Sequence, residues 1–276
     1  METETLGTFQ ESQLHDIERE ERENQMREIK FATMEIENIA NWMKNYVKGS
    51  GSKGYVVGLS GGVDSAVVAA LAVKAVGVEN VQGVIMPIES SPEDQKDAIL
   101  VAETLGIRYD ILDMYEMFEG MKNAYPYTVW NDNVFIGNIK ARLRMTMLYQ
   151  YAGEMDYLVA GTGNKSEDSI GYFTKYGDGG VDILPIVEYY KTEIRQLARV
   201  LGMPQIIWDR VSTAGLYEGQ TDEKDLGMSY DVIDSILYYL DTGKEYPIRH
   251  ADKIEVVKKL ITRNKHKNEY PPNYRR

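Results

Sequence analysis

Eight consecutive residues combine three glycines, two hydroxyls and a carboxylate: Gly58, Leu59, Ser60, Gly61, Gly62, Val63, Asp64 and Ser65. Glycines let a backbone turn come close to phosphate oxygens, and the start of a helix directs unpaired N–H groups and the positive end of its dipole at a bound anion. We therefore interpret Gly58–Ser65 as a phosphate loop. A bare carboxylate would repel a polyphosphate, so Asp64 also predicts a metal ion.

The residues on either side of the phosphate loop suit this role. The apolar run 55–57 predicts a buried strand before it, and the run 66–71 predicts a helix after it. The loop lacks the lysine of G-x-x-x-x-G-K-[ST] and does not match G-x-G-x-x-G. A plainer alternative is a Gly-Gly turn in which Asp64 and Ser65 only cap the following helix.

Ser-Gly-Gly-x-Asp-Ser after a strand resembles the signature loop of the ATP pyrophosphatases, which split ATP between its α and β phosphates. The resemblance implies that backbone N–H groups and the hydroxyls of Ser60 and Ser65 hold the departing pyrophosphate. It also implies that Asp64 binds Mg²⁺.

A second polar segment, the glycine-rich segment 161–182, follows another predicted strand at 157–160. It reads Gly-Thr-Gly-Asn-Lys-Ser-Glu over 161–167 and Gly-Tyr-Phe-Thr-Lys-Tyr-Gly-Asp-Gly-Gly-Val-Asp over 171–182. These charges and glycines suit a highly charged ligand and a cation better than they suit packing. Ligands of open parallel sheets lie outside the carboxyl ends of the strands, so we expect this segment and the phosphate loop to face one crevice.

Together with Ala-Gly-Leu at 214–216 and Gly-Gln-Thr-Asp-Glu at 219–223, these segments resemble the NAD synthetase branch of the ATP pyrophosphatases. The resemblance runs from about Ile29 to Lys267 and implies an ammonia-dependent ligase of NAD biosynthesis. In that family the nicotinate carboxylate of deamido-NAD attacks the α-phosphate of ATP and expels pyrophosphate, and ammonia then displaces AMP from the adenylate. This route requires no protein nucleophile, which agrees with a chain that has no cysteine.

The resemblance implies roles for individual residues around ATP. Asp64 and Glu167 are the expected Mg²⁺ ligands, and ATP is expected to contact the phosphate loop, Thr162, Lys191 and Thr213. The expected catalytic set is Asp64, Glu167, Lys191 and Thr213. Plainer interpretations are a solvated loop acid for Glu167 and an exposed first-turn lysine for Lys191, although the helix dipole disfavours a cation there.

The expected contacts with deamido-NAD are Arg142, Lys175, Asp182, His266 and Lys267. Surface charge is the plainer interpretation of Arg142, which lies on a predicted amphipathic helix, and the His266–Lys267 pair lies in a polar tail. One departure from the family concerns the adenosine side of the pocket. Several relatives have an arginine just before the Leu-Pro that follows the second strand, whereas this chain has Ile85-Met86-Pro87, so no residue is assigned there.

Strand and helix patterns alternate along the chain. Further strands are expected at 81–86 and 107–112, and helices at 29–47, 92–105, 137–151, 191–201, 222–240 and 251–263. This spacing predicts an α/β fold with a Rossmann-like open parallel sheet flanked by helices on both faces. We expect residues 1–276 to form a single ATP pyrophosphatase-type domain, with a charged arm at 1–25 and the polar tail at 264–276.

Composition limits the partners and the location. The 43 acidic and 31 basic residues give a net charge of −12, which argues against a nucleic-acid surface. No run of about 18 apolar residues occurs, and the first residues do not resemble a signal peptide, so we expect a cytoplasmic protein without membrane contacts. The absence of cysteine excludes disulfides, thiolate metal sites and a cysteine nucleophile, and the three histidines are too scattered for zinc.

Two other functions stay open at this point. One is a different ATP pyrophosphatase-type ligase or a tRNA-modifying enzyme, and the other is a nucleotide-binding sensor that has lost turnover. The family usually forms homodimers with the substrate site near the subunit interface. The apolar faces of the predicted helices at 29–47 and 137–151 are candidate subunit contacts.

Overall fold

A computed structural model describes residues 31–125, 132–213, 220–243 and 251–274. Its sheet has four parallel strands in the order β3–β2–β1–β4. The strands are β1 (Gly54–Gly58), β2 (Val81–Ile85), β3 (Arg108–Ile111) and β4 (Tyr157–Val159). All four were predicted to within about two residues at each end. The predicted Rossmann-like open parallel sheet is therefore confirmed.

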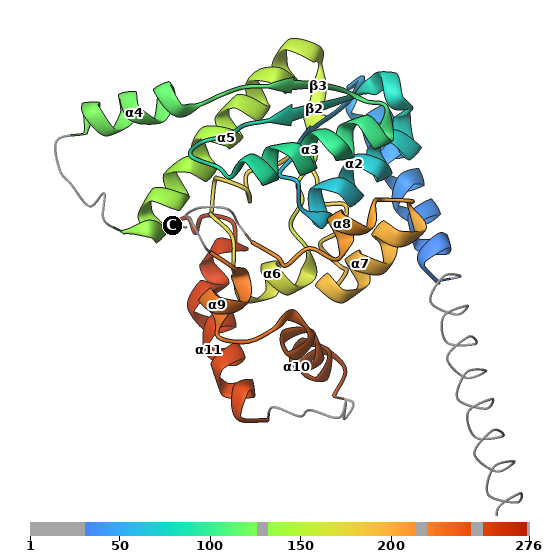
Figure 1. Ribbon diagram of the computed structural model, residues 1–276. Helices are drawn as coiled ribbons and strands as arrows, with labels where there is room; N and C mark the ends of the chain where they lie inside the picture. Colours follow the sequence, from blue (N-terminus) through green and yellow to red (C-terminus); the bar gives the residue numbers. More distant parts are fainter. Residues whose placement is uncertain (1–30, 126–131, 214–219, 244–250, 275–276) are drawn as a thin grey trace, which may run out of the picture.

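Helices cover both faces of the sheet, and the alternation of side chains along β1 shows why (Figure 1). Tyr55 and Val57 enter one apolar cluster, and Val56 enters the other. The first cluster includes helical residues of 31–50, α2 (Val63–Val76), α3 (Pro92–Leu105), α7 (Lys191–Val200) and α8 (Gln205–Trp208). The second includes α4 (Tyr115–Ala124) and α5 (Asn133–Met155).

A third apolar cluster lies outside the sheet, around Tyr230, Ile233 and Val257. It is built from α6 (Lys165–Ile170), α10 (Tyr230–Thr242) and α11 (Ile254–Asn264), with α9 (Asp222–Leu226) beside it. In Figure 1 these helices extend away from the sheet on the side where α6 lies. The short 3₁₀ turns are η1 (Val78–Asn80), η2 (Ala251–Lys253) and η3 (Lys265–Lys267).

Several helix ends follow from local sequence. Ser91 caps α3, because its Oγ accepts the N–H of Asp94 at 3.1 Å, as its place before Pro92 predicted. The single helix predicted over 222–240 is wrong. Gly227 adopts φ 68°, a left-handed conformation that ends α9 before α10 begins.

Two other helices differ from or lie partly outside the predicted ranges. The helix α5 starts earlier than predicted because Asp132 Oδ1 accepts the N–H groups of Val134 and Phe135 at 2.9 and 3.1 Å. Ala32, Ile36, Ile39, Met43 and Val47 form the predicted buried face of the first helix. Ile29, the charged arm and residues 214–219 lie outside the described residues.

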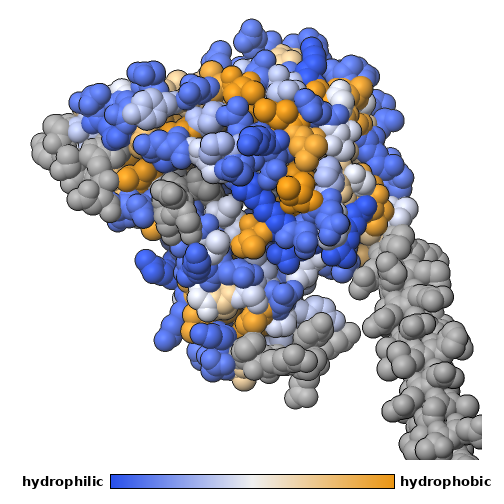
Figure 2. All heavy atoms as spheres, in the orientation of Figure 1, coloured by the Kyte–Doolittle hydropathy of each residue, from blue (hydrophilic) through white to orange (hydrophobic). Residues whose placement is uncertain are grey.

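The surface gives little sign of a large apolar interface in the view of Figure 2. Hydrophilic residues dominate that face, and the hydrophobic ones are gathered in small separate groups. Within the described residues, no helix has the length and hydropathy needed to cross a bilayer.

The phosphate loop is held between β1 and α2, and Gly61 determines its shape. Gly61 adopts φ 81°, and a Cβ placed on it would lie 2.5 Å from the carbonyl oxygen of Asp94. The first turn of α3 therefore packs directly against the backbone of the loop. Only glycine fits this position without displacing α3.

We expect Gly61→Ala to lower the free energy of unfolding, measured by urea denaturation, more than Gly202→Ala does. Gly202 has a similar φ of 76° but nothing within 4 Å of an added Cβ, so its substitution should cost only the left-handed strain of about 1–2 kcal/mol. Gly61→Ala adds a clash with backbone, which should cost a further 1–3 kcal/mol or so. Equal losses in the two variants would contradict the close packing of α3 on the loop.

Candidate active site

The carboxyl ends of β1 and β4 open into one cleft of about 590 Å³. Both of the polar segments singled out in the sequence line it, because β1 and β4 are neighbours in the sheet. The predicted residues on its wall are Gly58, Leu59, Ser60, Gly62, Val63, Asp64, Ser65, Thr162, Glu167, Lys191, Thr213 and Lys267. The expectation that the two segments face one crevice is confirmed.

The ammonium group of Lys191 lies between the carboxylates of Asp64 and Glu167. Its Nζ is 2.6 Å from Asp64 Oδ2 and 3.0 Å from Glu167 Oε1. The side chain of Lys191 is only 4% exposed, and those of Asp64 and Glu167 are 16% and 18% exposed. The plainer interpretations of Lys191 as an exposed lysine and of Glu167 as a solvated loop acid are therefore wrong.

Asn164 binds the carboxylate of Asp64 and the backbone of Glu167. Its Nδ2 donates to Asp64 Oδ1 at 2.8 Å, and its Oδ1 accepts the N–H of Glu167 at 3.0 Å as the N-cap of α6. The sequence analysis missed Asn164, although an asparagine three residues before an acid is a signal of a helix start. One amide thus joins the cap of α6 to the carboxylate of the phosphate loop.

The plainer interpretation of Asp64 and Ser65 as helix caps does not hold. Gly62 is the N-cap of α2 and has no side-chain cap. The oxygens of Asp64 are bound to Asn164 and Lys191 instead, while Ser65 Oγ lies 3.1 Å from Ser60 Oγ and donates to the carbonyl of Gly62 at 2.9 Å. The side chains of the phosphate loop therefore brace the loop and point into the cleft.

The charges in this cluster perturb each other. Burial raises the pKa of Glu167 to about 7, helped by the charges of Asp64 and Asp222 and opposed by Lys191. Burial lowers the pKa of Lys191, but the carboxylates of Asp64 and Glu167 outweigh it and raise that pKa above its usual range. Because Lys191 Nζ is nearer to Asp64 than to Glu167, the attraction between the ammonium and the Glu167 carboxylate is the weaker of the two.

A divalent cation fits the donors that meet here. Asp64 and Glu167 both contact the ammonium of Lys191 with hard carboxylate oxygens, the ligand type that Mg²⁺ prefers. No cluster of three or more such protein ligands occurs within the described parts of the chain. A magnesium ion held by these two residues would thus take its other oxygens from water or from phosphate, which is its usual habit at nucleotide sites.

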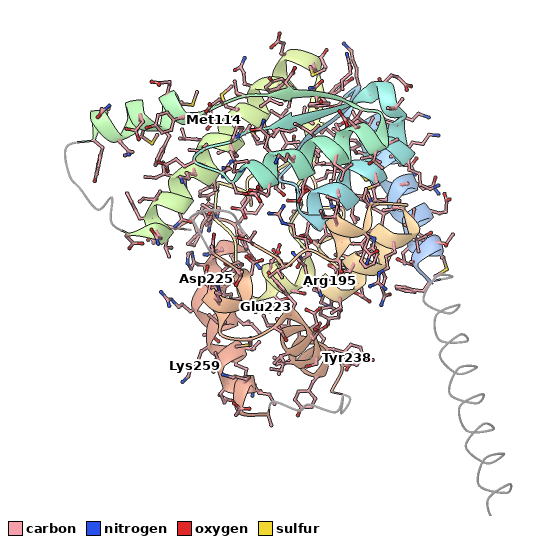
Figure 3. All side chains as sticks on the ribbon, in the orientation of Figure 1. Met114, Arg195, Glu223, Asp225, Tyr238 and Lys259 are labelled. Atoms are coloured by element: carbon pink, nitrogen blue, oxygen red, sulfur yellow. The ribbon has the colours of Figure 1, made fainter. Side chains whose placement is uncertain are left out.

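The cleft extends towards α9 and α11, which both contribute lining residues. The hydroxyl of Tyr230 lies 3.3 Å from Glu167 Oε1 and 3.0 Å from Asp222 Oδ2, and burial raises the pKa of Tyr230. Figure 3 places Glu223 and Asp225 of α9 at the junction between the sheet layer and the C-terminal helices. Ser212, beside Thr213 on the cleft wall, has a buried Oγ with no hydrogen-bond partner among the described residues, which suits a ligand contact.

Four of the residues predicted to bind deamido-NAD do not line the cleft: Arg142, Lys175, Asp182 and His266. Arg142 Nη2 donates to the carbonyl of Lys175 at 3.3 Å, and Lys175 Nζ donates to the carbonyl of His266. Asp182 Oδ2 accepts the N–H of Val159 at 2.8 Å, so it fixes the end of β4. Their contacts with deamido-NAD stay predictions.

The tail is anchored through Lys267, which does line the cleft. Its Nζ donates to the carbonyls of Gly171 and Phe173 at 2.8 and 2.7 Å. Asn268 Nδ2 donates to Asp168 Oδ2 at 3.0 Å, beside α6. The first residues of the polar tail therefore form part of the wall of the site.

Several charged residues of the cleft were missed by the sequence analysis, among them Asp178, Arg210 and Arg144. Asp178 accepts the N–H of Thr174 at 2.9 Å, and burial raises its pKa. Arg210 forms an ion pair with Asp97 at 2.6 Å and another with Asp94. Arg144 lies on α5 and contacts the segment after β2. Asp178 lies in the glycine-rich segment but was given no role there, whereas Arg144 and Arg210 stand outside the motifs and only the fold brings them to the cleft.

A Ser-Gly-Gly-x-Asp-Ser loop at the end of a parallel strand, opposite a second carboxylate, defines an ATP pyrophosphatase-type nucleotide site. Residues 35–271 match the model of the family described as NAD synthase, and the chain belongs to that family. It is 48% identical to the NH(3)-dependent NAD(+) synthetase of Methanococcoides burtonii over 207 residues, which cover 75% of this chain and 79% of the relative.

Two solved structures are similar over nearly the whole described fold. The NMN synthetase of Francisella tularensis has a TM-score of 0.80 at 36% identity, covering 88% of this chain and 99% of its own. The NH3-dependent NAD synthetase of Campylobacter jejuni has a TM-score of 0.76 at 31% identity, with the same coverage. The recognition of the family from its motifs is thereby confirmed.

We expect Lys191→Gln to lower the free energy of unfolding by about 3–5 kcal/mol, because it leaves two close carboxylates without their cation. Chemical denaturation would measure the loss. Lys165→Gln is a matched control, since Lys165 pairs with Asp241 at 2.7 Å but the two side chains are 25% and 45% exposed. It should lose no more than about 1 kcal/mol. Equal losses in the two variants would contradict the buried charge cluster.

The raised pKa of Glu167 predicts a pH dependence of stability. A carboxyl whose folded pKa lies above its ordinary value of 4.5 stabilises the protein fully below that pH, and the contribution is lost as the pH rises through about 7. The metal-free protein should therefore become less stable across this window, by at most about 1.4 kcal/mol per pH unit from this group. Melting temperatures of the wild type and Glu167→Gln from pH 4.5 to 8 test this. The same slope in both proteins would contradict the assignment.

Proposed function

We propose that this protein is an ammonia-dependent NAD synthetase, a ligase that forms the C–N bond of the nicotinamide amide. It joins ammonia to the nicotinate carboxylate of deamido-NAD and converts ATP to AMP and pyrophosphate. One observation carries the proposal. In a chain of the NAD synthase family, Asp64 and Glu167 meet at the ammonium of Lys191, in the same cleft as an intact phosphate loop.

The chemistry fits a site without a protein nucleophile. A carboxylate is a poor acyl donor, and adenylation by ATP gives it a leaving group that ammonia can displace. The N–H groups of the phosphate loop hold the departing pyrophosphate, and Lys191 and Thr213 lie on the cleft wall where they can bind phosphate oxygens. The residues act by positioning and by charge neutralisation.

Mg²⁺ is the metal that we assign to this site. Asp64 and Glu167 would hold it, and it would supply positive charge that neutralises the triphosphate and the leaving pyrophosphate. Their hard oxygen donors and their shared cation position support this choice. The remaining ligands would be water and phosphate oxygens.

A homodimer and a deamido-NAD site near its interface are further parts of the proposal. The residues proposed for deamido-NAD are Arg142, Lys175, Asp182, His266 and Lys267. Several aromatic and apolar side chains of the first helix are exposed by more than 40%, which suits a subunit contact: Phe31, Met34, Trp42 and Tyr46.

One structural neighbour favours a second substrate. It is named an NMN synthetase and is 36% identical to this chain, so amidation of the nicotinate mononucleotide is the competing reaction. Both reactions would use the same adenylation chemistry. They differ in whether the substrate carries a second nucleotide, which the residues outside the cleft would contact.

We expect the purified protein, supplied with deamido-NAD, ATP, Mg²⁺ and ammonium, to form NAD, AMP and pyrophosphate in equal amounts, measured by chromatography. Asp64→Asn should lose at least about 100-fold in kcat, because it removes one of the two carboxylates proposed to hold the Mg²⁺ that neutralises the reacting phosphates. Asp156→Asn, at an exposed ion pair with Lys53, is the matched control. Formation of neither NAD nor AMP would overturn the proposal, and a higher kcat/KM for the mononucleotide would reassign the substrate.

A further inference from the structure

One helix presents two arginines in different directions. In α5, Arg144 lies on the cleft wall with Asn138, Ala141, Met145 and Leu148. These residues are spaced three or four positions apart along the helix, so they share one of its faces. Arg142 lies two positions earlier, about 200° around the helix, and its side chain contacts the main chain of Lys175 outside the cleft.

The guanidinium of Arg144 is bound only to uncharged groups among the described residues. Its Nε donates to the carbonyl of Met86 at 2.9 Å, and its Nη2 lies 3.4 Å from Ser90 Oγ. A guanidinium carries five N–H donors, so most of them are left for another partner. Met86 and Ser90 both belong to the segment that follows β2 and line the same cleft.

A partly buried cation without a counter-ion is costly, which indicates that Arg144 has a partner in the loaded site. Burial lowers the pKa of Arg144 to about 10, although the more distant charges of Asp94 and Asp178 oppose this. The side chain is therefore still protonated at neutral pH. An anion that enters the cleft would give it the missing partner.

The position of Arg144 indicates which anion it would bind. Leu148, one turn further along α5, would lie 3.4 Å from a Cβ on Gly58, and Met86 would lie 3.6 Å from the same point. Arg144 thus lies between the phosphate loop after β1 and the segment after β2. A nucleotide with its outer phosphates on the phosphate loop and its nucleoside towards the end of β2 would place its inner phosphate in this space.

We propose that Arg144 is a nucleotide-binding residue that contacts the α-phosphate of ATP and then the phosphate of the adenylate. The inference rests on the proposed function and supplies the adenosine-side cation for which the sequence offered no candidate. Arginine suits this role because its planar fork can bind phosphate oxygens through two N–H groups. Its bond to the Met86 carbonyl would fix the segment after β2 around the same nucleotide.

Calorimetric titration of the full chain with ATP and Mg²⁺, and separately with deamido-NAD, tests the role of Arg144. Arg144→Gln should weaken ATP binding at least about tenfold while the affinity for deamido-NAD stays unchanged. Arg144→Lys keeps the charge but not the fork, so it should lose less than the glutamine variant. Arg108→Gln is the matched control, since Arg108 also donates to a main-chain carbonyl, that of Glu79 at 3.0 Å, but lies outside the cleft.

Unchanged ATP affinity in Arg144→Gln would overturn the inference. An equal loss of affinity for ATP and deamido-NAD together with a lower melting temperature would also overturn it, because that result would indicate a structural role for Arg144. Should the glutamine variant fail to fold, selective loss of ATP affinity in Arg144→Lys supports the inference, and wild-type affinity overturns it. Selective ATP loss in a protein that makes no NAD would refute the proposed function alone. NAD synthesis with ATP binding independent of Arg144 would refute this inference alone.

Discussion

Two carboxylates can share a partly buried site only if a cation lies between them, and this constraint organises the molecule. Asp64 comes from the loop after β1, and Glu167 comes from the first turn of α6, after β4. The ammonium of Lys191, only 4% exposed, is the cation. The two acids lie close together because β1 and β4 are neighbours in the sheet, and the lysine is the first residue of α7. This contact therefore depends on both the strand order and the position of α7.

The helices outside the sheet hold that lysine in place. The N–H of Lys191 donates to Ser166 Oγ at 2.8 Å, and the hydroxyl of Ser166 donates to the buried carboxylate of Asp234 on α10. Asp234 also accepts the N–H of Thr192 at 3.0 Å. The backbone at the start of α7 is therefore fixed by two side chains from helices outside the sheet, and this fixes the point from which the Lys191 side chain reaches the carboxylates.

The sequence predicted what depends on local pattern. Apolar runs located the four strands, and Ser91 before Pro92 located the start of α3. The break at Gly227 was missed because the apolar pattern continues across it, and only the backbone conformation shows that the helix ends there. The contacts between distant residues were not predicted from the residues alone: Lys191 meets a carboxylate 127 positions away, and its role came from the family resemblance, with only the helix dipole as a local argument against a surface lysine. Arg144 is an intermediate case, since its spacing from Ala141 and Leu148 would have placed it on one face of a helix with them, but the sequence analysis gave it no role.

The two predicted substrate regions meet at the glycine-rich segment. Lys267 lines the cleft and binds the carbonyls of Gly171 and Phe173, whereas its neighbour His266 lies outside and accepts a bond from Lys175. Two adjacent residues of the tail thus differ in whether they line the cleft. The tail and the backbone of 171–175 are joined by side-chain-to-carbonyl bonds in both directions, because Lys267 donates to the segment and Lys175 of the segment donates to the tail. These bonds fix the glycine-rich segment and the tail relative to each other.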